Sequence, residues 1–144
     1  MTVPVASGES LIGCVTPPDQ IAALLAVARK YRSFKYWDKV KVGSSESHIT
    51  GQGFNAVKFD PRRPARTIRR NDGNLGVHGA MCWNERRRFS LPEFKRFGSF
   101  PDDFAFAGEF EEGIRQIGDC VPPLFMKAIA RHITENILAR ISGK

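Results

Sequence analysis

The run FPDDF, residues 100–104, decides how the last third of the chain folds. Pro101 fixes its own φ angle and biases the preceding Phe100 toward an extended backbone, while the two aspartates that follow favour a turn. A turn of this kind can hold the end of one helix against the next element. We therefore expect residues 100–104 to brace the structure.

A second run, IGDCVPP at residues 117–123, predicts the entrance to another helix. Gly118 supplies flexibility, Asp119 can cap the helix with its carboxylate, and the two prolines fit only in a first helical turn. The first N–H groups of a helix lack partners inside it and face whatever lies beyond its end. The run therefore predicts a loop that leads into the last helix.

Three helices surround these two runs. Ser90 and Glu93 form a capping box that starts the first helix, and Gly98 ends it. Residues 109–117 predict a short helix with acids in its first turn. The last helix covers residues 121–141, and its apolar stripe is typical of a face packed in a core. That stripe consists of Val121, Leu124, Phe125, Ala128, Ile129, Ile133, Ile137 and Ile141.

The remaining segments alternate loops with short elements. A helix starts at Thr16, which precedes two prolines and an acid, and runs to about residue 30. Residues 54–59 alternate as a strand does, and residues 104–107 also look β-like. Residues 60–70 contain two prolines that keep them extended, and residues 71–79 form a glycine-rich loop.

Composition supports one packed unit. The chain has 144 residues, of which 42% are hydrophobic, and seven phenylalanines lie between residues 89 and 110. This is enough for one domain with its own core, or for part of a larger domain. We predict an α+β fold, with a small mixed region of short strands and loops over residues 1–84 and a helical region over residues 85–144.

The three cysteines, Cys14, Cys82 and Cys120, lie far apart and form no CxxC pair. This spacing argues against a disulfide framework or a zinc knuckle, and His48 stands alone without a second metal ligand at the right spacing. No apolar run approaches the roughly 20 residues that span a bilayer, and residues 1–11 do not form a signal peptide. We therefore expect a reducing, cytoplasmic compartment and no metal.

Positive charge is concentrated in the middle of the chain. Residues 58–96 hold eleven Lys and Arg against four acids, a surplus equal to the net charge of +7 of the whole chain. An arginine-rich segment of this kind is typical of a surface that contacts phosphates, although a solvated basic face that binds nothing has the same composition. Residues 31–42 interleave aromatics with cations, which favours an ordinary amphipathic surface over base stacking.

Three runs in order resemble a known family: RTI at residues 66–68, ERRRFSLPEFKRFGSFPDDFAFAG at residues 85–108 and RQIGDCVPPLFMKAIARHI at residues 115–133. They resemble the C-terminal part of DNA (cytosine-5) methyltransferases, namely the end of the target-recognition domain and the ninth and tenth conserved motifs. The resemblance covers residues 58–138. It extends more weakly to YWDKVKVGSSES at residues 36–47, which is similar to the recognition region of bacterial and phage members.

The resemblance implies a DNA-contacting side. Thr67 and Ile68 match a Thr-Leu/Ile dipeptide whose hydroxyl is expected near a DNA phosphate, and the alternative for Thr67 is a strand residue that contacts only protein. Residues 88–104 match the ninth motif, which supports the recognition domain, so their charged side chains are expected to be scaffold. We predict that duplex DNA is contacted by Arg62, Arg63, Arg66, Thr67, Arg69, Arg70, Asn74 and His78.

The resemblance also implies a cofactor side. Gly118, Asp119, Cys120 and Val121 match the tenth motif, whose loop and helix start line the S-adenosylmethionine pocket of the family. This chain has Asp119 where the family usually has Asn, and a carboxylate that faced the pocket would repel the carboxylate of the methyl donor. Cys120 stands at a position that is small in the family, so we expect a small buried residue there rather than a reactive thiol.

Several chemical parts of the family's reaction have no match in this sequence. The family's nucleophile is a thiolate in a Pro-Cys motif, and none of the three cysteines follows a proline. No FxGxG cofactor turn, Glu-Asn-Val motif or QxRxR motif occurs. We therefore expect a C-terminal segment, or a second subunit, of a bacterial or phage cytosine-5 methyltransferase of a restriction-modification system.

In this interpretation residues 1–84 are part of the target-recognition region. Residues 85–144 complete a catalytic domain whose Rossmann-like part lies elsewhere. We expect S-adenosylmethionine only in the complete enzyme, a catalytic half as partner, and no methyl transfer by this chain alone. Two alternatives remain: a stand-alone DNA-binding or regulatory module, and a structural fragment that forms a homodimer through the last helix.

Overall fold

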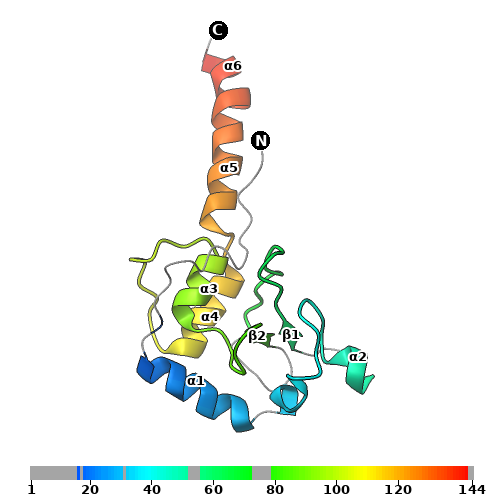
Figure 1. Ribbon diagram of the computed structural model, residues 1–144. Coiled ribbons are helices and arrows are strands. Elements are labelled where there is room, and N and C mark those ends of the chain that lie inside the picture. Colours follow the sequence, from blue (N-terminus) through cyan, green and yellow to red (C-terminus); the bar gives the residue numbers. More distant parts are fainter. Residues whose placement is uncertain (1–15, 17, 31, 52–55, 73–78, 143–144) are drawn as a thin grey trace.

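A computed structural model describes residues 16, 18–30, 32–51, 56–72 and 79–142. Helices and two short strands mix in one body, from which a long helix projects (Figure 1). This is the predicted α+β class. The elements are α1 (Pro18–Lys30), η2 (Arg32–Tyr36), α2 (Ser47–Thr50), β1 (Val57–Lys58), β2 (Ala80–Met81), α3 (Leu91–Phe97), α4 (Phe110–Asp119), α5 (Pro123–Ile133), η3 (Thr134–Leu138) and α6 (Ala139–Ser142).

The capping box predicted for α3 is present. Ser90 Oγ accepts a hydrogen bond from Glu93 N at 3.4 Å, and Glu93 Oε2 accepts one from Ser90 N at 2.6 Å. These bonds satisfy two backbone donors that the start of a helix leaves without internal partners. The Thr16 hydroxyl lies 2.8 Å from Ser90 Oγ, so the start of the described chain is tied to the same point.

A buried ion pair stands behind this cap. The Arg87 guanidinium donates to both Glu93 carboxylate oxygens, at 2.8 and 2.9 Å, and both side chains are more than 90% buried. Arg87 Nε also donates to Glu85 at 2.6 Å. Burial opposes the charged form of Arg87, but hydrogen bonds to the two glutamates outweigh it and raise the pKa of the guanidinium. The two hydrogen bonds between Arg87 and Glu93 fix the direction of the chain just before α3.

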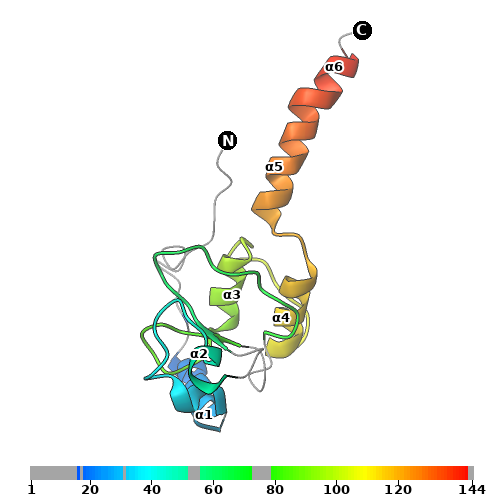
Figure 2. The ribbon, with the colours of Figure 1, turned by 90° about the vertical axis from the view of Figure 1, so that its right-hand side faces the viewer.

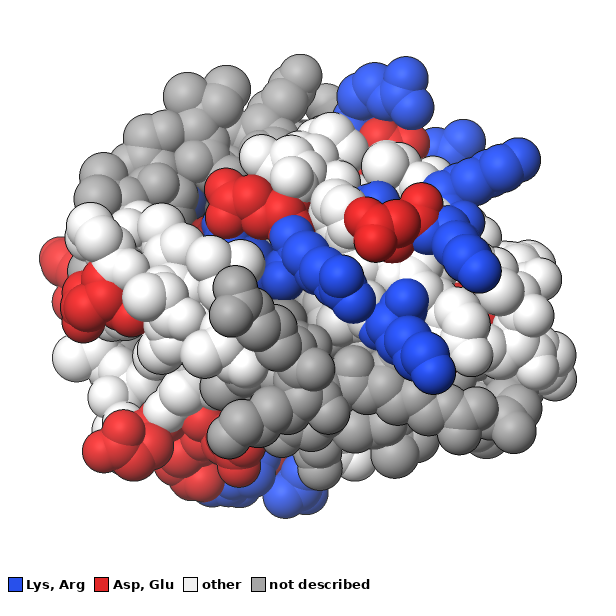
Figure 3. Space-filling model, turned by 60° about the horizontal axis from the view of Figure 1, so that its bottom comes forward, with Lys and Arg blue, Asp and Glu red and all other residues white. Residues whose placement is uncertain are grey.

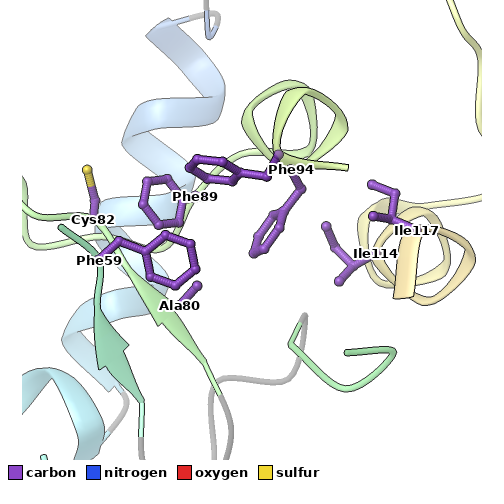
Figure 4. Close-up of a cluster of buried hydrophobic side chains, with 8 residues drawn as sticks. Phe59, Ala80, Cys82, Phe89, Phe94, Ile114 and Ile117 are labelled. Carbon is purple, nitrogen blue, oxygen red and sulfur yellow. The ribbon is translucent and has the colours of Figure 1, made fainter. Parts of the chain in front are cut away.

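The main core forms around Phe89. Its ring lies 5.1 Å from that of Phe59, 6.0 Å from that of Phe94 and 5.0 Å from that of Phe97. Figure 4 shows side chains from the strands and from α3 on one side of this cluster, with Ile114 and Ile117 of α4 on the other. The prediction of a packed interior is confirmed for Phe89, Phe94 and Phe97, whereas Phe104 is exposed. The core joins the two predicted regions, since it draws residues from both.

The aromatic segment before the strands is structural, as its composition favours. Phe34 is fully buried, and Trp37 Nε1 donates to the Cys82 carbonyl at 2.9 Å. Lys58 Nζ lies 3.5 Å from the centre of the Trp37 ring and donates to the Trp37 carbonyl at 3.2 Å. Burial lowers the pKa of Lys58. This packing attaches η2 to the strands.

The sheet is smaller than the sequence predicts. Of the strand expected over residues 54–59, only β1 pairs with β2, in parallel, with Val57 opposite Ala80 and Lys58 opposite Met81. Residues 54 and 55 lie outside the described chain. The β-like segment expected at residues 104–107 is wrong, since no strand forms there. The rings of Phe100, Phe104 and Phe106 instead pack on one another with centres 4.9–5.1 Å apart, and this packing bends the chain.

The last helix forms as predicted, but its environment is not the predicted one. α5, η3 and α6 make one continuous helical rod, with a π-helical turn at η3, that projects from the body in both ribbon views (Figures 1 and 2). None of its described residues is buried. The expected core stripe is therefore a solvent-facing one, because the described core closes on α3, α4 and the strands. No helix among the described residues is long and apolar enough to cross a membrane.

We predict that Glu93→Gln lowers the free energy of unfolding by about 3 kcal/mol, because it removes the buried carboxylate and leaves the Arg87 charge with only the half-exposed Glu85. Chemical denaturation followed by circular dichroism measures this. Glu85→Gln is the matched control, since it removes the other, half-exposed glutamate and is expected to cost less than about 1 kcal/mol. Equal losses in the two variants would contradict the role given to the buried pair.

Candidate functional site

A cavity of about 420 Å³ lies where the arginine-rich residues 60–72, called the basic segment below, meet the ends of three helices. One wall is the extended segment of residues 65–68, a second is the end of α3, and the others are the end of α4 and the start of α5. It is lined by Ala65, Arg66, Thr67, Ile68, Phe97, Gly98, Ser99, Ile117, Gly118, Cys120, Pro122, Leu124 and Phe125. The structure therefore brings together residues predicted for DNA and residues predicted for the cofactor.

Gly118 makes the closest contact between these walls. A Cβ atom at this position would lie 2.2 Å from Arg70 N and 2.4 Å from the Arg69 carbonyl carbon. Only a residue without a side chain fits there. Gly118 was expected in a flexible loop, and that expectation is wrong because α4 continues to Asp119. The glycine is needed for a close approach of two backbones rather than for flexibility.

Asp119 does not cap α5, contrary to the prediction. The N-cap of α5 is Pro122, which makes no side-chain cap bond. Because Asp119 ends α4, its carboxylate instead lies 3.5 Å from Arg115 Nη1, one turn earlier in the same helix, and 3.9 Å from Arg70 Nε. Asp119 is not among the residues that line the cavity. Its negative charge is offset by two arginines.

A residue that the sequence reasoning did not single out holds the start of α5. Ser99 Oγ accepts a hydrogen bond from Leu124 N at 3.1 Å, which satisfies a donor in the first turn of α5. Ser99 has φ of 60°, an uncommon backbone conformation for a residue with a side chain. Gly98, the predicted end of α3, leaves room for this turn, since a Cβ there would lie 3.0 Å from the Ile117 side chain. In the sequence, the signal for this role was the pair Gly98 and Ser99 directly after the apolar stripe of the expected helix.

The two remaining cofactor candidates differ in position. Cys120 lines the cavity, is half-buried and donates through Sγ to the Ile117 carbonyl at 3.0 Å. Burial raises the pKa of its thiol, which favours the unreactive protonated form. Val121 is exposed and is not part of the lining. Within the described residues, no group of three His, Cys, Asp or Glu side chains lies close enough to hold a metal ion.

The basic segment begins with two exposed arginines. Arg62 and Arg63 share the Asp60 carboxylate, at 3.1 and 3.6 Å, yet their side chains are 84% and 76% exposed. Hydrogen bonds from Arg62 hold the pKa of the Asp60 carboxyl below its usual value. On the face of the molecule in Figure 3, Lys and Arg side chains gather toward one side and project into solvent, with acidic groups beside some of them.

The segment ends on a buried aspartate. Asp72 is 1% exposed and accepts hydrogen bonds from Arg66 Nη2 at 2.8 Å, Arg69 Nη2 at 3.4 Å and Arg69 N at 2.9 Å. Burial lowers the pKa of Arg66 against the attraction of Asp72. Thr67, between the two arginines, is exposed at the cavity. The predicted contacts Asn74 and His78 lie outside the described residues.

A family model described as C-5 cytosine-specific DNA methylase matches residues 16–135, which include every wall of this cavity. The chain belongs to this family. The resemblance seen in the three sequence runs is thereby confirmed. The match also takes in α1, which precedes all three of the runs that carry that resemblance.

Several curated relatives from this DNA methylase family match part of the chain. The DNA (cytosine-5-)-methyltransferase M.ApeKI of Aeropyrum pernix is 36% identical over 60% of this chain and 19% of its own length. The type II methyltransferase M.SacI of Streptomyces achromogenes is 35% identical over 56% of this chain and 23% of its own length. The chain thus spans about a fifth of the length of these relatives. No solved structure matches it significantly.

We predict that Gly118→Ala destabilises this DNA methylase chain by about 2–3 kcal/mol, because the new methyl group meets the backbone of residues 69 and 70 and cannot be accommodated by a rotamer change. Thermal unfolding monitored by circular dichroism measures the loss.

Gly113→Ala in the same helix is the control. The atoms within 3 Å of its added Cβ belong to the flexible Leu91 side chain, and alanine favours the helix by up to about 1 kcal/mol. We expect a change of less than about 1 kcal/mol. A Gly118 variant as stable as the Gly113 variant would show that the close approach is not required.

Proposed function

We propose that the chain supplies part of the target-recognition surface of a DNA cytosine-5 methyltransferase and one wall of its S-adenosylmethionine pocket, while the nucleophile and the main cofactor fold come from a catalytic half. That half lies either elsewhere in the same polypeptide or in a separate subunit. The observation that carries the proposal is the exposed apolar face of the last helix, on a chain that spans only about a fifth of its relatives.

The last helix has the composition of a buried interface. Its exposed apolar side chains recur along the rod and continue to the cavity, since Leu124 and Phe125 belong to both surfaces. They are Leu124, Phe125, Met126, Ile129, Ile133, Ile137, Leu138 and Ile141. An apolar surface of this extent is unfavourable in water and marks an interaction site. A catalytic half that covered it would also reach the open side of the cavity.

The cavity suits one wall of a cofactor pocket. Its lining combines apolar side chains with Gly118, which has only backbone atoms to present to a small ligand. The substitution of Asp for the usual Asn does not oppose this role, because Asp119 is turned to Arg115 and Arg70 and is absent from the lining. S-adenosylmethionine would supply the methyl group, while these residues would shape the pocket and exclude water.

The basic segment suits the DNA side. Exposed arginines lie at the start of a segment whose residues 65–68, Thr67 among them, form one wall of the cavity. Arginine forks bind phosphate oxygens well, and their number sets the salt dependence of binding. The target base would have to leave the duplex to reach the catalytic half, as enzymes that modify bases require. In this proposal the chain orients the duplex and takes no part in the bond-forming step.

We predict that the purified chain transfers no methyl group from labelled S-adenosylmethionine to duplex DNA. Activity is expected only when it is joined to, or mixed with, a catalytic half that carries the Pro-Cys and FxGxG motifs. The catalytic half alone is the control and is expected to have less than about 1% of the combined activity, since it lacks DNA positioning. Methyl transfer by the chain alone would contradict the division of roles.

We predict that Ile129→Gln combined with Ile133→Gln weakens binding of the catalytic half about 100-fold, because two apolar side chains no longer gain from burial. Isothermal titration calorimetry measures the affinity. Lys127→Gln combined with Arg131→Gln makes a matched change on charged residues of the same helix and is expected to change the affinity less than about 5-fold. Equal effects in both pairs would argue against an apolar docking face.

The same variants separate the alternatives. A homodimer through the last helix would dissociate in the isoleucine variant during sedimentation of the chain alone. A stand-alone DNA-binding module would bind duplex DNA with unchanged affinity in that variant and gain no activity from any catalytic half. The proposed division of function therefore requires that the isoleucine variant lose both its affinity for the catalytic half and the methyl-transfer activity of the mixture.

A further inference from the structure

Two aspartates divide the arginines of the basic segment into two groups. Asp60 lies near its start and contacts Arg62 and Arg63, whereas Asp72 lies at its end and contacts Arg66 and Arg69. Each carboxylate therefore serves two arginines. The groups differ in how far the arginines are removed from solvent, and this difference determines which of them can reach a phosphate.

The arginines at Asp60 stay available. The side chains of Arg62 and Arg63 are 84% and 76% exposed, so a phosphate can approach their outer edges while Asp60 keeps its contact. The Asp60 side chain is itself only 7% exposed, so it is the exposure of the arginines, not of the acid, that leaves them open to a phosphate. Arg70 is similar, since it is 57% exposed and lies 3.9 Å from the half-exposed Asp119.

Arg66 is in the opposite situation. Its side chain is 26% exposed, its Nη2 lies 2.8 Å from the buried Asp72 carboxylate, and its Nε is buried with no hydrogen-bond acceptor among the described residues. Arg69 is intermediate: its side chain is 41% exposed, but its Nε is also buried and both its Nη2 and its backbone N–H contact Asp72. Neither buried Nε can reach a phosphate without repacking.

We propose that Asp72 is a positioning residue for DNA binding. It holds Arg66, and in part Arg69, inside the protein, so that the phosphate contacts of the segment come from Arg62, Arg63 and Arg70. The inference rests on the proposed DNA-binding function and specifies which residues perform it. It replaces the sequence expectation that all five arginines contact DNA.

The contacts of Asp72 also fix the shape of the basic segment. Asp72 is bound from Arg66 and from the backbone of Arg69, so it closes the chain over residues 66–72 into a tight turn. Thr67 lies within this turn and is exposed at the cavity, so the turn that holds the two arginines also shapes this wall of the cavity.

Salt dependence distinguishes the two groups of arginines. An arginine that gains a phosphate contact releases counterions and contributes about 0.9 to the slope of log K against log salt concentration. An arginine whose side chain is held inside the protein gains no phosphate contact and therefore releases no counterions on binding. We predict that Arg63→Gln lowers the slope measured by fluorescence anisotropy by about 1, whereas the chemically identical Arg66→Gln leaves it unchanged within about 0.3. A loss of about 1 in both variants would overturn the inference.

The aspartates provide the reciprocal test. Asp72→Asn removes the charge that holds Arg66 and Arg69, so we expect the slope to become steeper by about 1 or more as they gain phosphates. Asp60→Asn is the matched control and is expected to change the slope by less than about 0.3, because Arg62 and Arg63 are available already. An unchanged slope in the folded Asp72 variant would overturn the inference.

Arginine labelling of the unaltered chain decides the matter even if a variant does not fold. Phenylglyoxal, quantified by mass spectrometry, is expected to label Arg63 rapidly and Arg66 slowly, and duplex DNA is expected to protect Arg63 alone of the two. Rapid labelling of Arg66 with protection by DNA would contradict the proposal. If the unaltered chain shows no salt-dependent binding of DNA, the proposed function itself fails, and that result differs from every outcome above.

Discussion

The buried ion pair between Arg87 and Glu93 is the constraint on which the rest of the structure depends. It fixes the chain just before α3 and shares its carboxylate with the helix cap, so the start of α3 is set by charge as well as by packing. Phe89, between the paired residues, then centres the core that α4 closes. A pair of this kind specifies one arrangement, because any shift of the segment would leave a buried charge without its partner.

From this anchored core the contacts lead outward to both functional surfaces. The end of α4 brings Gly118 against the backbone of residues 69 and 70, and Ser99 at the end of α3 holds the first turn of α5. The basic segment and the last helix are thus positioned by the same two helices.

Local features were predictable from the sequence and long-range ones were not. The capping box at Ser90 and the turn at residues 100–104 depend on neighbouring residues, and both are present, the turn being tied to α3 by a 2.8 Å hydrogen bond from Arg96 Nε to Asp102. The roles of Gly118 and Asp119 depend on where α4 ends and on what packs there, which no local pattern states. The apolar stripe of the last helix predicted burial, and this is wrong for the described chain, where nothing covers the helix. An apolar stripe indicates that a surface favours burial but does not indicate what would cover it.

The central claim is that the last helix is a docking face for a catalytic half, and amide hydrogen exchange over residues 123–142 tests it most directly. In the chain alone at low concentration, these amides are expected to exchange faster than those of α3, since no described element packs on the rod. Addition of the catalytic half is expected to slow them. Exchange as slow as that of α3 in the isolated chain, or no change when the catalytic half binds, would contradict the account.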